Sequence, residues 1–491
     1  MTPDPRPIDH VLRGDGIALI DRDGAMTYAE AEAETTRLAG WLAGQGFDPG
    51  GRIATWLPKT RAACLMPLAA PRAGLVHVPV NPALRRAQVA HILGDSGAAL
   101  LLTQEARAAT LEPGDVPVGC RIATSTGEGD PLGPSRADPD ALAAILYTSG
   151  STGRAKGVML SHANLWLGAA SVASYLKLTP EDRVLGILPL AFEYGQNQLF
   201  SSWYAGAAVA PLDYLTARDV VKAVERVGAT TLAGVPPLWV QLLEADWPDE
   251  VAARLKRLTN SGGALTPRLV RGLRDRFAAA DVYAMYGLTE AFRSTYLDPT
   301  LIDAHPEAIG RAIPFAEVMA VRPDGSRAEL GEPGELVHAG PLVAQGYWRD
   351  PERTSQRFRP APAFAQSGGM AVWSGDTVIE GTDGLFRFVG RDDEMMKVSG
   401  NRVSPGEVEE AIMAGGEARE AVAVGTPDER LGQAIVAVVA GDPAREGDLR
   451  ARLRSELPAF MQPQRYVWRE ALPRNANGKL DRAAIRADVT P

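Results

Sequence analysis

A loop rich in small and hydroxyl residues carries the first chemistry that the sequence indicates. Residues 146–158 read LYTSGSTGRAKGV and follow an apolar run typical of a buried strand. Small residues let backbone N–H groups approach an anion, and the hydroxyls add donors, so the stretch predicts a phosphate-binding loop. It is not the GxxxxGK[ST] loop of P-loop NTPases, because Ala155 replaces its second glycine and Gly157 follows Lys156.

Lysine is rare in this chain, which makes its place in the loop informative. Lys and Arg total 51, and only seven of these are lysine. Three of the seven, Lys156, Lys397 and Lys479, lie in the motifs described here. Lysine is a slim point charge and arginine a wide planar fork. We interpret the choice as a sign of crowded phosphate chemistry that leaves no room for a guanidinium.

A hydroxyl and a carboxylate stand side by side in MYGLTEA, residues 285–291. A segment with a strand-like pattern ends there in a glycine turn, and Thr289 and Glu290 follow it. Mg²⁺ in nucleotide sites is commonly bound by one carboxylate together with substrate phosphates. The same residues could instead begin a helix, with Thr289 as its cap and Glu290 facing its dipole.

Taken together, the motifs resemble those of the AMP-forming adenylating superfamily, in order and at compatible spacing. That superfamily contains acyl-CoA synthetases, peptide-synthetase adenylation domains and luciferases. The resemblance runs from about residue 27 to 482. Its segments are TSGSTGRAKGV with LSHANL, SGGALTP (261–267), MYGLTEA, WSGDTV (373–378), GRDDE (390–394), KVSGNRVSPGEVEE (397–410) and PRNANGKLDR (473–482).

The resemblance implies a reaction in two halves. A carboxylate attacks the α-phosphate of MgATP, giving an acyl-adenylate and pyrophosphate, and a thiol then displaces AMP to form a thioester. It implies ATP, Mg²⁺ and CoA, or a carrier-protein phosphopantetheine in place of CoA. The catalytic residues implied are Lys156, Thr289, Glu290 and Lys479, with Glu290 as the metal ligand.

The resemblance also implies binding residues. Tyr286 would lie against the adenine and Asp376 would accept from the ribose, while Asp393 falls at the hinge position. Taken alone, Arg391 and Asp393 would read as an exposed turn. The ATP and AMP contacts implied are Thr148, Ser149, Gly150, Ser151, Thr152, Gly153, Gly263, Ala264, Tyr286, Gly287, Asp376 and Arg391, and the thiol tunnel is Ser399, Gly400 and Asn401.

The order of strand and helix patterns predicts an α/β fold. The sequence alternates between strand and helix patterns up to about residue 310 and then becomes richer in strand patterns. Its character changes again near 391–393. We expect a large N-terminal domain, 1–391, of parallel-sheet subdomains plus a β-rich subdomain, which binds ATP and the acyl group. A small α+β domain, 392–491, would follow and, by resemblance, would be mobile.

The segment LPLAFEYGQNQL, residues 188–199, bears on the substrate. Many acyl-CoA synthetases have Phe-His where this chain has Ala191-Phe192. FEYG resembles the FDxS-type element of amino-acid-activating members, in which the acid pairs with the α-ammonium group. Glu193 facing the pocket would favour an amino acid, and Glu193 facing solvent a simple acyl chain. The expected acyl-pocket residues are Phe192, Glu193, Tyr194, Gln196, Val235, Gly262 and Met285.

The resemblance therefore favours an acyl-CoA ligase, with a stand-alone amino-acid adenylating enzyme that loads a carrier protein as the alternative. A nucleotide-binding regulator without activity is a distant third, since it predicts damage at Lys479, Glu290 or Asp376, and all three are intact. Only nine residues follow Arg482, so we expect CoA or an acyl carrier protein to be met in trans.

Composition excludes several other classes. The net charge of −9 gives no electrostatic footprint for nucleic acid. No apolar stretch of about 18 residues predicts a membrane span, and the N-terminus does not read as a signal peptide. The two cysteines, Cys64 and Cys120, form no CxxC motif, which fits a reducing compartment. We expect a cytoplasmic protein whose partners are a small carboxylic or amino acid and a thiol acceptor.

Overall fold

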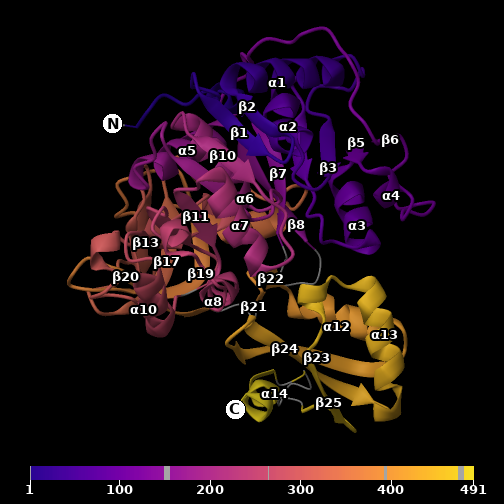
Figure 1. Cartoon of the computed structure of the whole chain (residues 1–491). Helices are drawn as coiled ribbons and strands as arrows, with labels where there is room; N and C mark the ends of the chain where they lie inside the picture. The colour runs from indigo at the N-terminus through magenta and orange to yellow at the C-terminus, as the bar shows by residue number, and fades with distance from the viewer. Residues whose placement is uncertain are drawn as a thin grey trace.

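The computed structural model describes residues 2–148, 155–263, 265–391, 395–473, 480 and 482–490. Of Gly390, Arg391 and Ala483 only the backbone is described. Figure 1 shows a large body, coloured indigo to orange, above a smaller yellow body that holds the C-terminal end of the chain. The fold is α/β, as the sequence predicts. No helix in the described part of the chain is long and apolar enough to cross a membrane.

One sheet of the large body is parallel up to its last strand. In spatial order its strands are β6 (Arg121–Ala123), β5 (Ala98–Thr103), β3 (Arg52–Trp56), β4 (Val76–Pro79), β7 (Leu142–Thr148) and β8 (Lys156–Ser161). Only β7 and β8 pair antiparallel. The parallel strands are nearly continuous apolar runs because helices cover such sheets on both faces. The helices of this region are α1 (Tyr28–Ala43), α2 (Arg61–Arg72), α3 (Arg86–Ser96) and α4 (Glu105–Ala108).

A second, longer sheet changes from antiparallel to parallel along its width. Its spatial order is β16 (Glu317–Val321), β17 (Pro333–Ala339), β19 (Met370–Glu380), β20 (Phe386–Arg391), β15 (Ala308–Ala312), β14 (Thr295–Tyr296), β13 (Asp281–Tyr286), β12 (Arg257–Asn260), β11 (Thr231–Gly234), β9 (Arg183–Gly186), β10 (Ala208–Pro211), β1 (Ile17–Asp21) and β2 (Gly24–Thr27). Pairing is antiparallel from β16 to β13 and parallel from β13 to β1. The antiparallel part is the β-rich subdomain expected after residue 310. The strand β18 (Phe358–Pro360) pairs with β19.

Helices and short 3₁₀ turns precede or follow the strands of this second sheet. Two of them, α5 (His162–Tyr175) and α6 (Glu193–Tyr204), lie against each other. Nearly every residue of α6 is buried, although its sequence, EYGQNQLFSSWY, is largely polar. The others are α7 (Ala217–Val227), α8 (Pro236–Leu243), α9 (Asp249–Ala252), α10 (Pro267–Arg276), α11 (Pro351–Arg357), η1 (Ile8–Val11), η2 (Thr289–Ala291) and η3 (Pro299–Leu301).

The small body is an α+β unit with its own apolar core. Its strands are β22 (Asn401–Val403), β21 (Met396–Val398), β24 (Gly432–Gly441) and β23 (Ala418–Asp428), with β25 (Arg465–Arg469) parallel to β24. Its helices and turns are α12 (Pro405–Ala414), α13 (Glu446–Glu456), α14 (Arg482–Val489), η4 (Pro443–Arg445) and η5 (Ala459–Met461). The domain boundary at 391/392 stays a prediction. It falls between β20 and β21, and Asp393 lies outside the described residues.

The carboxyl ends of the parallel strands position the functional residues, as is usual for open α/β sheets. Directly after β13 come Gly287 and η2, which carries Glu290. The loop after β9 leads to Phe192 and α6, and Val235 follows β11 directly. In Figure 1, β21 and β22 lie at the junction of the two bodies, where the small body faces these strand ends.

Candidate active site

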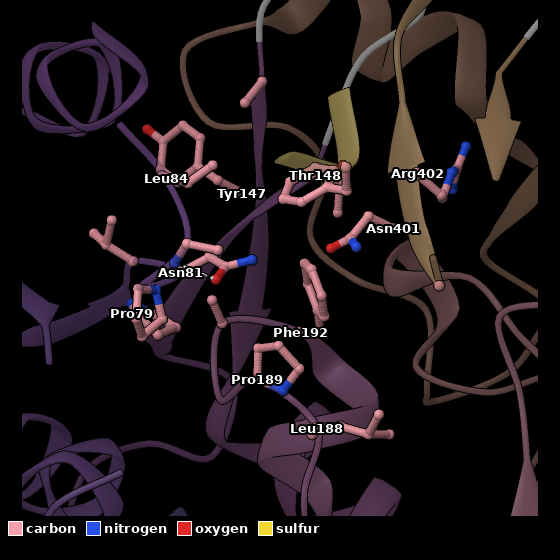
Figure 2. Close-up of a pocket in the computed structure, with 18 of the residues that line it drawn as sticks. Pro79, Asn81, Leu84, Tyr147, Thr148, Leu188, Pro189, Phe192, Asn401 and Arg402 are labelled. Atoms are coloured by element: carbon pink, nitrogen blue, oxygen red, sulfur yellow. Dashed lines mark hydrogen bonds between the residues drawn. The ribbon is translucent and has the colours of Figure 1, made fainter. Parts of the chain in front are cut away.

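A cavity of about 1010 Å³ is lined by residues of both bodies. It brings together much of what the sequence predicts. Figure 2 shows its wall, with Thr148 and Phe192 from the large body and Asn401 and Arg402 from the small one. The predicted residues that line it are Thr148, Phe192, Glu193, Tyr194, Val235, Gly262, Tyr286, Gly287, Thr289, Asp376, Ser399, Gly400 and Asn401.

Lys156 and Glu290 are held together by a tyrosine. Lys156, the first residue of β8, donates from Nζ to the Tyr347 hydroxyl at 2.6 Å. That hydroxyl donates to Glu290 Oε1 at 2.7 Å, and Lys156 Nζ lies 3.4 Å from the same oxygen. Glu290 is fully buried, on the 3₁₀ turn that follows β13. The two predicted catalytic groups therefore form one charge network, although 134 positions separate them in the sequence.

Burial and the neighbouring charges shift the pKa values of both Lys156 and Glu290. Burial lowers the pKa of Lys156 to about 8, and Glu290 opposes that shift. Burial alone would raise the pKa of Glu290, but the positive charges of Lys156, Arg357 and Arg402 hold it well below its ordinary value. Glu290 is thus a buried, ionised carboxylate. A charge buried in this way needs cationic partners to stay ionised.

Glu290 also has one carboxylate oxygen that is open to a metal ion. Its second oxygen, Oε2, is buried and accepts no hydrogen bond from the described residues. An acceptor left open in this way suits a hard cation, and Mg²⁺ commonly takes one carboxylate plus substrate phosphates. The described residues contain no group of three or more His, Cys, Asp or Glu side chains that could hold a metal ion.

The phosphate loop is described only at its two ends. The Thr148 hydroxyl is buried beside the cavity, and no described residue accepts or donates a hydrogen bond to it. At the other end, His91 Nε2 lies 2.8 Å from the Ala155 carbonyl. The predicted contacts Ser149, Gly150, Ser151, Thr152 and Gly153 lie outside the described residues, as do Ala264 and Lys479.

Two predicted nucleotide residues that line the cavity are joined by a hydrogen bond. The Tyr286 hydroxyl donates to Asp376 Oδ2, and both residues line the cavity. Asp376 on β19 is paired in register with Arg391 on β20, which puts the backbone of Arg391 beside it. Gly263 does not line the cavity, and its carbonyl accepts from Asn260 Nδ2 at 2.9 Å instead.

The small body inserts a tight turn between β21 and β22 into the cavity. Ser399 and Gly400 both have positive φ, 50° and 78°. A Cβ built on Gly400 would lie 2.6 Å from Val235 Cγ2, which is closer than real Cβ contacts allow. Glycine is therefore required at position 400 on two counts, its backbone conformation and its contact with the large body.

Five of the seven residues predicted for the acyl pocket line the main cavity, and Gln196 and Met285 do not. Gln196 is buried on α6 and lines neither the main cavity nor the smaller one beneath it. It is the fourth residue of α6, whereas the first two, Glu193 and Tyr194, line the cavity. Met285 lines only the smaller cavity, where its sulfur accepts from the Tyr175 hydroxyl at 3.0 Å.

Glu193 faces inward and already has a partner that the sequence motifs do not reveal. Arg293 Nη2 donates to Glu193 Oε1 and Oε2 at 3.3 and 3.1 Å, and both side chains are less than a tenth exposed. The guanidinium lies 4.5 Å from the centre of the Tyr194 ring. Burial raises the pKa of Glu193 to about 7, and Arg293 opposes that shift.

The sequence motifs did not predict two residues of the site, Arg293 and Tyr347. Neither falls inside a recognised motif, although Arg293 follows MYGLTEA after one residue.

Lys156 and Glu290 do not line the cavity themselves, but their neighbours Ala155 and Thr289 do. A cavity shared by two bodies, a buried carboxylate–lysine pair next to its lining and a glycine turn from the second body are together the features of an adenylating ligase. The chain belongs to the AMP-binding enzyme family: residues 11–348 match that family, and residues 407–479 match the AMP-binding enzyme C-terminal domain.

Relatives within the family differ in substrate and in length. The chain is 31% identical over 492 residues to the L-proline--[L-prolyl-carrier protein] ligase of Pseudomonas fluorescens, covering 96% of both chains. It is 30% identical over 493 residues to a linear gramicidin synthase protein of Brevibacillus parabrevis, where 96% of this chain spans only 6% of that protein. A double mutant of o-succinylbenzoate CoA synthetase from Bacillus subtilis, bound to a product analogue, is 25% identical with a TM-score of 0.88, over 99% of both chains.

Proposed function

We propose that this protein converts a carboxylic acid to an acyl-adenylate with release of pyrophosphate and then passes the acyl group to a pantetheine thiol. The observation that carries the proposal is the shared cavity. Residues suited to a nucleotide, to an acyl group and to a thiol all line it, and they come from both bodies. Each half-reaction would then take place in one water-restricted space.

In the first half, the residues would position the reactants and neutralise charge, which is the main contribution of proteins to phosphoryl-type chemistry. Lys156 would bind the phosphates, and Thr289 would donate to the α-phosphate. Glu290 would hold Mg²⁺, which would neutralise the charge of the leaving pyrophosphate. Tyr286 and Asp376 would bind the adenosine. Lys479 would approach the α-phosphate when the small domain rotates about Asp393, as the family resemblance implies.

In the second half, the thiol would reach the acyl-adenylate past the turn at Ser399–Asn401. The close contact of Gly400 with Val235 supports this path, because Val235 also lines the acyl region. Any side chain at position 400 would occupy the space between the two bodies. The arrangement described above would therefore correspond to the thiol-transfer half of the cycle.

The state of Glu193 favours an acyl substrate over an amino acid. An α-ammonium group needs an uncompensated carboxylate, but Arg293 already occupies both oxygens of Glu193. A substrate ammonium at this position would meet the guanidinium as a like charge. We therefore propose the acyl-CoA ligase type, with the amino-acid-activating type as the alternative that a direct test must address.

The test is ATP–pyrophosphate exchange on the purified protein with pools of fatty, aryl and amino acids. Exchange driven by an acyl pool supports the proposal, and exchange driven by amino acids alone contradicts the assignment of Glu193. Lys479→Ala should abolish the exchange. Lys222→Ala, on the exposed side of α7, is the matched control and should retain it.

The acceptor is tested separately, by adding CoA or a phosphopantetheinylated carrier protein to the driven reaction. Formation of an acyl-CoA supports the ligase type proposed here. Acylation of the carrier alone would place the protein with carrier-loading relatives. Exchange without transfer to either thiol would contradict the second half of the proposal.

A further inference from the structure

A second, smaller cavity lies beneath the acyl region. It encloses about 20 Å³ and is lined by Tyr175, Asn197, Gln198, Ser201 and Met285, among others. Tyr194 and Arg293 line both this chamber and the main cavity, so they form the wall between the two. Its volume suffices for about one water molecule, which needs roughly 10–15 Å³.

Much of the chamber lining is apolar, and several polar atoms of the residues that line it lack partners. Both amide atoms of Gln198, Oδ1 of Asn197 and Nε of Arg293 are buried without a hydrogen bond to the described residues. These residues are 6%, 2% and 2% exposed. Leaving such groups unpaired is costly, so buried polar atoms are nearly always satisfied by protein, water or ligand. Four unpaired polar atoms, on three side chains that line one small space, are the reason to expect a polar guest there.

The backbone places Arg293 at this wall under strain. Phe292, the residue before it, has φ 62° and ψ −73°, a conformation that non-glycine residues rarely adopt. Two glycines make the arrangement possible. A Cβ on Gly168 would lie 2.2 Å from the Phe292 ring, and one on Gly287 would lie 2.8 Å from Arg293 Cα. Strain held in place by close packing is typical of positions with a functional task.

The charges of the wall define what it can bind. Glu193 neutralises Arg293, so the pair as a whole offers neither a free cation for a second carboxylate nor a free anion for an ammonium. It does offer hydrogen-bond donors, because Arg293 binds Glu193 through Nη2 and makes no other hydrogen bond among the described residues. An uncharged oxygen acceptor is the group that such a wall can bind.

We propose that the chamber wall selects a carboxylic acid that carries an uncharged oxygen, as a hydroxyl or keto group, on the part of the molecule remote from the reacting carboxylate. The oxygen accepts from Arg293 directly or through the water of the chamber, which Gln198 and Asn197 hold. The inference rests on the proposed adenylation activity and names its substrate class. It makes Arg293 and Gln198 specificity-determining residues.

The experiment is pyrophosphate exchange with acids in matched pairs: hexanoate against a keto-substituted hexanoate, and phenylpropanoate against its para-hydroxy derivative. Norleucine and adipate test the added ammonium and the added carboxylate. The oxygen-bearing member of a pair should have a kcat/KM higher by about tenfold or more, because a site built for a hydrogen bond rejects the analogue that lacks it. Norleucine and adipate should fall below hexanoate.

Three variants test the residues through the ratio of kcat/KM within a pair. Gln198→Leu removes an unsatisfied amide from the core, and Arg293→Met with Glu193→Gln removes the pair without leaving a buried charge. Both should bring the ratio towards one. Gln196→Leu is the matched control, since Gln196 is a buried glutamine on the same helix that lines neither cavity, and should keep the wild-type ratio. Thermal melting of each variant verifies folding.

Two kinds of failure can be told apart. Exchange driven equally by both members of each pair, or best by norleucine or adipate, overturns the inference and leaves adenylation established. The assignment to the chamber is overturned if the kcat/KM ratio within a pair stays at the wild-type value in Gln198→Leu and in Arg293→Met with Glu193→Gln. It is also overturned if the control Gln196→Leu lowers that ratio as much as they do. The absence of exchange with every acid overturns the proposed function, and the inference with it.

Discussion

Gly400 of the small body lies against Val235 of the large one, so closely that a Cβ on Gly400 would come within 2.6 Å of Val235 Cγ2. The backbone of Gly400 also approaches Gly262, whose own Cβ position is 3.9 Å from the Gly400 carbonyl oxygen. Three residues far apart in the chain thus meet at the edge of the acyl region. The contact links the position of the small body directly to the shape of the site.

Gly400→Ala should therefore impair thiol transfer more than adenylation. The new methyl group has to displace Val235 or move the small body, and misplacement by about 1 Å can cost on the order of 100-fold in rate. The measurement compares thioester formation with pyrophosphate exchange in the same preparation. Equal losses in both reactions would contradict the role assigned to the contact.

Two further variants separate the contact from backbone strain. Gly384 also has positive φ, 71°, but its Cβ would lie no closer than 3.7 Å to any neighbour. Gly384→Ala thus carries the conformational cost without the clash and should leave transfer intact. Adding Val235→Ala to Gly400→Ala should recover part of the lost transfer, because it removes the methyl groups that the new Cβ meets.

Tyr347→Phe should weaken the use of ATP, because the hydroxyl joins Lys156 to Glu290. Hydrogen bonds to charged groups contribute about 1.5–3 kcal/mol, so we expect kcat/KM for ATP to fall by roughly 10- to 100-fold. The control is Tyr283→Phe on β13, whose hydroxyl makes no hydrogen bond within the described part of the chain. A loss of similar size in Tyr283→Phe would show that general destabilisation is the cause.

The residues that we assign to the nucleotide come together in the structure because their motifs are local. MYGLTEA places Tyr286 and Glu290 a few positions apart, and the structure needs only β13 and a 3₁₀ turn to present them. The helix α1 is equally local, since Thr27 and Glu30 form a capping box directly before its apolar pattern. In such cases short-range geometry decides the outcome.

The acyl region was less predictable because its partners come from distant segments. Glu193 and Arg293 are 100 positions apart, and no local pattern indicates that one neutralises the other. The polar sequence of α6 would suggest an exposed helix, yet Asn197 and Gln198 are buried and line the chamber. A helix whose sequence contradicts its burial in this way marks a site that tertiary packing has built, as local conflicts often do at functional sites.

The pH dependence of nucleotide binding should follow Lys156. Its pKa is lowered by burial from 10.5 to about 8, so the free protein loses this charge as the pH rises through about 8. Affinity for ATP should weaken over that range. Lys156→Met should bind ATP weakly at every pH and remove this step from the profile. A wild-type affinity that stays flat across pH 8 would contradict the assignment.

Stability should change in the opposite direction over the same range. Between about 8 and 10.5 the unfolded chain keeps the Lys156 proton that the folded chain has lost. Stability rises with pH wherever the unfolded state binds more protons, so this residue should add to stability as the pH rises through that window. The measurement is denaturant unfolding of the nucleotide-free protein, compared with Lys156→Met, which should lack this contribution.

Two glycines within helices should respond oppositely to alanine. Gly168 lies in α5, and its Cβ would sit 2.2 Å from the Phe292 ring, whereas Gly94 lies in α3 with no atom within 4 Å of its Cβ position. Overpacking a core costs about 1–3 kcal/mol, so Gly168→Ala should destabilise the protein by that amount and shift Phe292 and the adjoining Arg293. Gly94→Ala should stabilise it by about 0.5–1 kcal/mol through helix propensity alone. Urea unfolding gives both free energies, and Phe292→Leu added to Gly168→Ala should recover part of the loss. If both alanine variants stabilised the protein, helix propensity would decide the effect at Gly168, and the proposed strain behind Arg293 would lose its support.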